Sequence, residues 1–179
     1  GGIPSGQATE EYNGSSWATG GTMIGSKYSA GAAGTQNAAF IAGGAPTTST
    51  SENYDGTSWS SSGTMNTART NLSGAGTQNE GLIFGGNPAP TTGTATELYN
   101  GTSWSNTNLM NLARYEMAQG GSQDAAFGAG GTNPSTLMIG NTELFSAFCS
   151  TTFCSTLPVW SGGANVITAR QYVRGAGTP

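Results

Sequence analysis

Short apolar segments alternate with turns of small and polar residues along the whole chain. Three mainly apolar runs of four or five residues each end at a pair of glycines, and these runs are Ala38–Ala42, Gly81–Phe84 and Ala125–Ala129. Runs of this length between Gly, Asn and Ser residues are typical of β-strands. Residues 106–119 have a helix-like pattern, but the matching residues 63–74 break it. We therefore expect strands and loops throughout, and no helix.

One nine-residue motif of polar and aromatic residues occurs three times at regular intervals. Residues 9–17, 51–59 and 96–104 each carry Glu, Tyr, Gly and Trp at the same offsets, and residues 142–145 open a fourth, altered copy. The glutamates of the four copies lie 42, 45 and 46 residues apart, and they are Glu10, Glu52, Glu97 and Glu143. Repeats of this length indicate an array of similar supersecondary units.

Each unit is predicted to form a four-stranded antiparallel sheet. A first strand, at 28–33, 72–75 and 115–119, leads through a turn of small residues into the apolar run, which is the second strand. The Glu-x-Tyr segment is the third strand, and Trp opens the fourth. Between these last two strands stand Asn-Gly or Asp-Gly pairs, which readily accept the positive φ of a tight hairpin turn. Sheets of this kind repeated around an axis make a β-propeller.

The unit resembles the kelch repeat, and the resemblance covers nearly the whole chain. The shared features are an apolar strand that ends in Gly-Gly, a Tyr ten to fourteen residues later, a Trp five residues beyond it, and an Arg before the next first strand. The resemblance implies an all-β fold, a kelch-like β-propeller of about four repeats that are four-stranded antiparallel blades. Small Ser-, Thr- and Asn-rich arrays of this kind also resemble structural proteins of tailed bacteriophages.

The phase of the repeat predicts how the 179 residues divide. We expect a single propeller segment with a partial blade at 1–26, complete blades at 27–66, 67–111 and 112–167, and a final strand at 168–179. The first and last pieces together lack a second strand. We therefore expect either a fragment of a larger propeller or missing strands that come from elsewhere.

The composition excludes several classes of protein. Only 8% of the residues are charged, against roughly a quarter in an average soluble domain. The chain is nevertheless not expected to be disordered, because its aromatic residues keep a fixed phase. Its net charge is −4 and it has no basic run, which argues against nucleic-acid binding. No apolar run approaches 18 residues, so we expect no membrane insertion.

The repeated charges have two interpretations. Four of the five basic residues share one phase, and these are Lys27, Arg69, Arg114 and Arg170. They are either a ring of binding charges or structural partners of the repeated glutamates. We favour structural partners, because binding rarely needs four copies of one pair and because buried charges persist only when paired. The kelch resemblance implies the same role.

The tryptophans also stand at one repeat position, as Trp17, Trp59, Trp104 and Trp160. Exposed indole rings would suit stacking on sugars. A repeating strand position instead favours packing between neighbouring blades, and we expect these side chains in the core.

The sequence contains few groups of side chains that are suited to catalysis. The chain has no His, which excludes Ser-His-Asp and Cys-His systems and the usual zinc and copper sites. The other acidic residues are scattered and form no recognisable pair for glycoside hydrolysis. We expect no enzymatic activity and no cofactor. The alternative is the propeller part of a kelch-type secreted enzyme, similar to a carbohydrate oxidase, with its catalytic residues outside this chain.

One module carries an insertion. The distance from Glu143 to Trp160 is ten residues longer than in the other copies, which places extra residues at about 146–155. This insertion contains both cysteines, Cys149 and Cys154, which are either a disulfide or two free thiols. Phe148 and Phe153 beside them indicate either a contact loop or a tolerated insertion.

The expected function is display of polar loops by a non-enzymatic structural or binding propeller. Loops 45–50, 87–94 and 132–141 are expected to share one face with loops 60–66 and 105–111. Their neutral polar composition suits a surface glycan or another structural protein subunit, including a second copy of the chain. We therefore expect a role in virion assembly or host attachment, as in a tail fibre or adhesin. The corresponding location is a virion or a cell surface.

Overall fold

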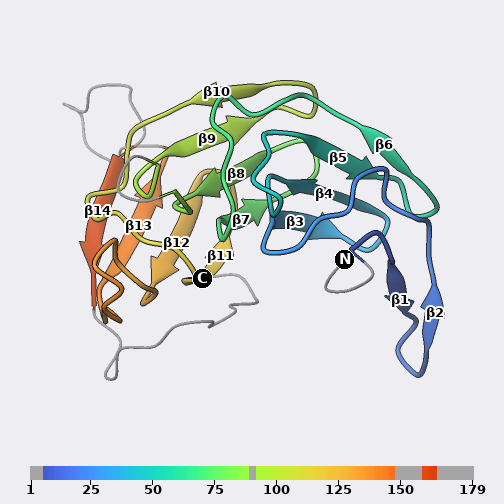
Figure 1. Ribbon diagram of the computed structural model, residues 1–179, viewed down its shortest axis with the longest axis horizontal. Coiled ribbons are helices and arrows are strands. Elements are labelled where there is room, and N and C mark those ends of the chain that lie inside the picture. The colour runs from blue at the N-terminus through green and yellow to red at the C-terminus, as the bar shows by residue number, and fades with distance from the viewer. Residues whose placement is uncertain (1–5, 89–91, 148–158, 165–179) are drawn as a thin grey trace.

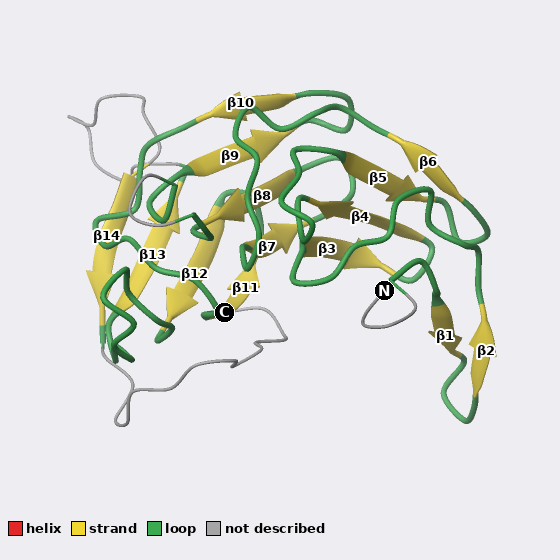
Figure 2. Cartoon of the chain, viewed as in Figure 1, coloured by secondary structure: helices red, strands yellow, loops and turns green. Residues whose placement is uncertain are grey.

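The computed structural model describes residues 6–88, 92–147 and 159–164. This part of the chain consists of β-strands, turns and loops, without a helix (Figure 2). The prediction of an all-β fold is therefore confirmed. The same residues include no helix long and apolar enough to cross a membrane.

The strands form one hairpin and three four-stranded antiparallel sheets (Figure 1). The hairpin joins β1 (Glu10–Tyr12) to β2 (Trp17–Thr19). The first full sheet contains β3 (Gly31–Thr35), β4 (Ala38–Ala42), β5 (Ser51–Tyr54) and β6 (Trp59–Ser61). The second contains β7 (Ser73–Gly76), β8 (Gly81–Phe84), β9 (Thr96–Tyr99) and β10 (Trp104–Asn106). The third contains β11 (Ala118–Gly121), β12 (Ala125–Ala129), β13 (Thr142–Ser146) and β14 (Val159–Gly163).

The sheets lie side by side in an arc with their first strands innermost (Figure 1). Each sheet is a simple meander, and β7 contacts both β3 and β11. These inner strands are rich in glycine and alanine because they approach closely. A Cβ atom at Gly74, for example, would lie 2.7 Å from the carbonyl oxygen of Ala32. The arrangement is compatible with the blades of a β-propeller, and the arc made by the described residues is open on one side (Figure 1).

The double glycine that ends each second strand is a backbone requirement. Gly85 and Gly86 have φ angles of 67° and 110°, where residues with a Cβ atom are strained. A Cβ atom at Gly85 would also lie 2.7 Å from the carbonyl oxygen of Arg114. This conformation lets the Gly86 N–H donate to that carbonyl at 2.9 Å. The glycine pair thus attaches each sheet to the loop that leads into the next one.

The hydrophobic core lies between neighbouring sheets. Six buried side chains of one cluster come from the first two full sheets and the loop between them, and these are Phe40, Met65, Leu72, Ile83, Tyr99 and Trp104. A second cluster joins the second and third sheets, and includes Leu82, Phe84, Met110, Met117, Phe145 and Trp160. Each sheet therefore depends on its neighbours for burial of its apolar faces.

The turn between the third and fourth strands is held by one side-chain oxygen. Asp55 Oδ1 accepts hydrogen bonds from the N–H groups of Thr57 and Ser58, both at 2.8 Å. Asn100 Oδ1 accepts the equivalent bonds in the next module, at 3.0 and 2.8 Å. The donors favour the ionised carboxylate, so the pKa of Asp55 is lowered from its ordinary value of 3.8, with the Ser58 N–H as the largest cause.

We predict that Asp55→Asn retains the turn and removes a pH-dependent part of its stability. A lowered folded-state pKa stabilises the protein above pH 3.8, and this contribution is lost as the pH falls through the folded-state pKa. The wild type should therefore unfold at a slightly higher urea concentration than the variant at pH 6, and the difference should shrink at acidic pH. Asn100→Asp is the reverse control and should acquire the same pH dependence. A gap between wild type and Asp55→Asn that stays constant with pH would contradict this prediction.

Candidate functional site

A buried ion pair lies at the centre of the second full sheet. Arg69 Nη2 and Glu97 Oε1 are 3.0 Å apart, and both side chains are fully buried. Arg69 Nη1 also donates to the carbonyl oxygens of Gly85 and Ala95, at 2.8 and 2.7 Å. Burial lowers the pKa of Arg69, while the nearby Glu97 carboxylate acts in the opposite direction. The pair ties the incoming loop to strand β9 and to the double glycine.

The neighbouring sheets contain the same arrangement. Arg114 pairs with Glu143, and its Nη1 donates to the carbonyl oxygens of Gly130 and Asn141. Lys27 Nζ lies 3.5 Å from Glu52 Oε1 in the first full sheet. All these side chains are nearly inaccessible to solvent. The repeated charges of the three full sheets therefore pair with one another in the interior.

The first glutamate of the series differs from the other three. Glu10 is exposed, and within the ranges that the structure describes it forms no ion pair. A structural partner for Glu10 stays a prediction, because those ranges place no basic loop residue in front of strand β1. Arg170, the last basic residue of the series, lies outside the described residues.

The tryptophans become more buried along the array. Trp104 and Trp160 are 7% exposed, and Trp59 is half-buried. Each indole N–H donates to a hydroxyl group of the preceding sheet or hairpin, and the pairs are Trp59 with Thr9, Trp104 with Ser51 and Trp160 with Thr96. Trp17 is 68% exposed, so the core prediction is wrong for this residue. The hairpin that carries Trp17 has no preceding sheet among the described residues. Trp59 is half-buried because the element in front of its sheet is only a two-stranded hairpin.

The cysteine-bearing insertion cannot be placed on the structure. Cys149, Cys154, Phe148 and Phe153 lie outside the described residues, which include only Ser146 and Ala147 of the range 146–155. A disulfide and a contact loop remain predictions from the sequence.

The loops between sheets form a continuous layer. Backbone bridges join Thr48 to Arg69, Thr70 to Asn87 and Tyr115 to Thr132, and thus link the loops within sheets to the loops between them. Most exposed positions here are polar, as expected. The structure also exposes four apolar side chains on described loops of the last two modules, Leu109, Leu112, Leu137 and Met138. Sequence analysis missed them, although apolar residues within otherwise polar loops were a visible signal.

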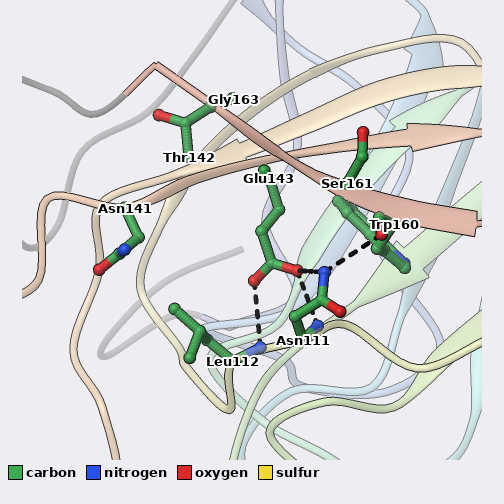
Figure 3. A pocket seen from close by; sticks show the side chains of 9 residues that line it. Asn111, Leu112, Asn141, Thr142, Glu143, Trp160, Ser161 and Gly163 are labelled. Carbon is green, nitrogen blue, oxygen red and sulfur yellow. Dashed lines mark hydrogen bonds between the residues drawn. The ribbon is translucent and has the colours of Figure 1, made fainter.

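A hollow of about 460 Å³ lies at the outer edge of the third sheet (Figure 3). Among the described residues that line it, Glu143 is the only acidic one, and both of its carboxylate oxygens accept hydrogen bonds. One accepts from the N–H and side-chain amide of Asn111 at 2.7 and 2.9 Å, and the other accepts from the Leu112 N–H at 3.1 Å and from Arg114. The remaining polar groups that line it are neutral, and include Asn141 and Thr142. The hollow offers hydrogen bonds without a free general acid or base.

Acidic groups elsewhere do not gather into a larger site. Within the described ranges no three Asp, Glu, His or Cys side chains are close enough to hold a metal ion together. Tyr54 donates a hydrogen bond to Glu11 across the first two modules. This bond, followed by burial, raises the pKa of Tyr54 and keeps its hydroxyl protonated at neutral pH. The contact joins two modules and does not generate a nucleophile.

No family model matches the chain, and no curated protein matches it.

Proposed function

We propose that the chain is a kelch-like β-propeller segment with a structural and binding role rather than an enzymatic one. The observation that carries the proposal is the burial of the repeated charges in ion pairs such as that of Arg69 and Glu97. Since these groups stabilise the sheets, the loops are the part of each module free to vary in length and composition. A rigid array of sheets that presents variable loops suits recognition of another molecule.

The proposed partner is another structural protein subunit, in virion assembly or in attachment to a host surface. Neutral polar loops also suit a surface glycan. The exposed Leu109, Leu137 and Met138 favour the protein, because apolar side chains on loops mark protein contacts more often than sugar contacts. A tail fibre or an adhesin on a virion or cell surface is the setting that fits these features.

The proposal predicts that loop substitutions weaken binding without affecting the fold. The full chain would be tested for binding to a neutral glycan array and to structural subunits encoded beside it. Leu137→Ser combined with Met138→Ser should weaken binding by about tenfold or more, as at an interface hot spot. Val159→Ser is the matched control, because this exposed residue lies on strand β14 away from the loops. Equal binding by both variants, or turnover of a sugar by the purified chain, would contradict the proposal.

A further inference from the structure

Neighbouring full sheets are joined by a repeated contact between an aromatic pair and a receiving surface. In the second sheet the pair is Tyr99 and Trp104, with ring centroids 4.5 Å apart. The Trp104 ring lies 5.5 Å from Phe40 of the first sheet, and its N–H donates to Ser51 Oγ at 3.1 Å. Asn53 donates to the Tyr99 hydroxyl at 3.1 Å. Phe40, Ser51 and Asn53 thus form the receiving surface.

The next junction repeats this geometry. The aromatic pair of the third sheet is Phe145 and Trp160, with centroids 5.2 Å apart. Trp160 lies 5.0 Å from Phe84 and donates to Thr96 Oγ1 at 3.2 Å, while Leu98 packs against the same cluster. The receiving side chains therefore differ between the two junctions. In both junctions an indole N–H donates to a hydroxyl group of the preceding sheet.

Within the described residues, the hairpin at one end of the arc carries an aromatic pair for which no sheet provides a receiving surface. Tyr12 and Trp17 face each other in register, as Tyr99 and Trp104 do, and their ring centroids are 5.2 Å apart. They are 46% and 68% exposed. We call these two residues the leading face.

The third sheet at the other end carries a receiving surface on which the described part of the chain places no aromatic pair. Phe127 pairs in register with Leu144, as Phe40 pairs with Asn53, and Thr142 stands two residues before Leu144, as Ser51 stands before Asn53. We call Phe127, Thr142 and Leu144 the trailing face. All three line an apolar hollow of about 400 Å³, and Leu144 is 45% exposed.

We propose that the leading face of one copy of this chain binds the trailing face of a second copy. Trp17 Nε1 would donate to the Thr142 hydroxyl, and the Tyr12 ring would lie on Leu144. The occupant is a second copy because the two open faces are the two halves of an interface that the chain already forms internally. This inference does not depend on the loop proposal, since it concerns the ends of the arc.

The interface is heterologous, so two copies either close a ring or begin a filament. With three full sheets and one hairpin in each copy, a closed pair would contain six full sheets and two hairpins. Propellers of four to eight blades are the usual range, so a two-copy ring falls within it.

Sedimentation of the full chain between about 1 and 100 µM tests the proposal, a range that covers micromolar dissociation constants. The wild type should reach twice its mass of 17.9 kDa or more as the concentration rises. Trp17→Ala and Leu144→Glu should each weaken association by about tenfold or more. Ile24→Glu is the matched control, because it adds the same charge at an exposed aliphatic residue that belongs to neither face, and this variant should associate like the wild type.

Mixing the two variants distinguishes this arrangement from any symmetric one. Trp17→Ala retains a trailing face and Leu144→Glu retains a leading face, so an equimolar mixture should form one-to-one dimers that neither variant forms alone. A wild type that stays at 17.9 kDa, or a mixture that stays monomeric, would overturn the proposal. A monomer destabilised by Leu144→Glu would also overturn it, and would assign the trailing face to another segment of the same chain.

Discussion

Replacement of Arg69 by methionine is expected to lower the free energy of unfolding by about 3–5 kcal/mol, because it leaves Glu97 buried without its counter-charge. Both side chains are fully buried at 3.0 Å, so solvent cannot replace the lost partner. The substitution also removes two hydrogen bonds to the carbonyl oxygens of Gly85 and Ala95. Since domains are stable by about 5–15 kcal/mol, this loss is a large fraction of the total. Urea unfolding followed by tryptophan fluorescence measures it.

Two further variants separate the unpaired charge from simple loss of packing. Arg69→Met combined with Glu97→Leu removes both charges and should be more stable than the single variant, since apolar residues often replace a buried pair at little cost. Lys27→Met should cost less than Arg69→Met, because the Lys27–Glu52 pair is longer, at 3.5 Å, and lies beside the two-stranded hairpin. If the double variant is as unstable as Arg69→Met, the unpaired charge is not the cause.

Trp104→Ala is expected to destabilise the protein by about 3–5 kcal/mol, and Trp17→Ala by no more than about 0.5 kcal/mol. Trp104 is 7% exposed, stacks on Tyr99 and contacts Phe40 across the sheet boundary, so truncation leaves a cavity. Trp17 occupies the same repeat position but lies 68% exposed. The two substitutions remove the same atoms, so a difference in lost stability reports the contact of Trp104 with the neighbouring sheet.

Dilute conditions, in which the chain is monomeric, keep this comparison separate from the association of two copies. Trp59→Ala, at a half-buried position, should give an intermediate loss. Equal losses for Trp17→Ala and Trp104→Ala would show that the hairpin is covered in solution. That result would contradict both the exposure of Trp17 and the leading face.

Several features of the fold followed from the sequence because their causes are local. The double glycine at Gly85 and Gly86 predicted the end of a second strand, and positive φ values at both residues explain why only glycine serves there. Asp55 and Gly56 predicted a hairpin turn, which the Asp55 carboxylate holds through N–H groups two and three residues later. Strand pairing followed because each sheet is a meander of consecutive strands.

The candidate surfaces were predicted less well because they depend on distant residues. The sequence indicated that Arg69 has a structural partner, but Glu97 lies 28 residues away and the structure identifies the pair. In the repeat pattern, Thr142 and Leu144 occupy the same positions as Thr96 and Leu98 of the preceding copy. The sequence did not reveal that their sheet leaves a hollow beside them.

The sequence by itself determined the all-β character, the length of the repeat and the order of strands within each module, because glycine pairs, turn residues and short apolar runs act over a few neighbouring residues. The tertiary structure alone decided which copies of a repeated residue are buried. Trp17 and Trp104 have nearly the same local sequence, and in the part of the chain that the structure describes only Trp104 has a sheet in front of it. Burial depends on the surface that a neighbouring sheet presents, and residues adjacent in the chain do not specify that surface.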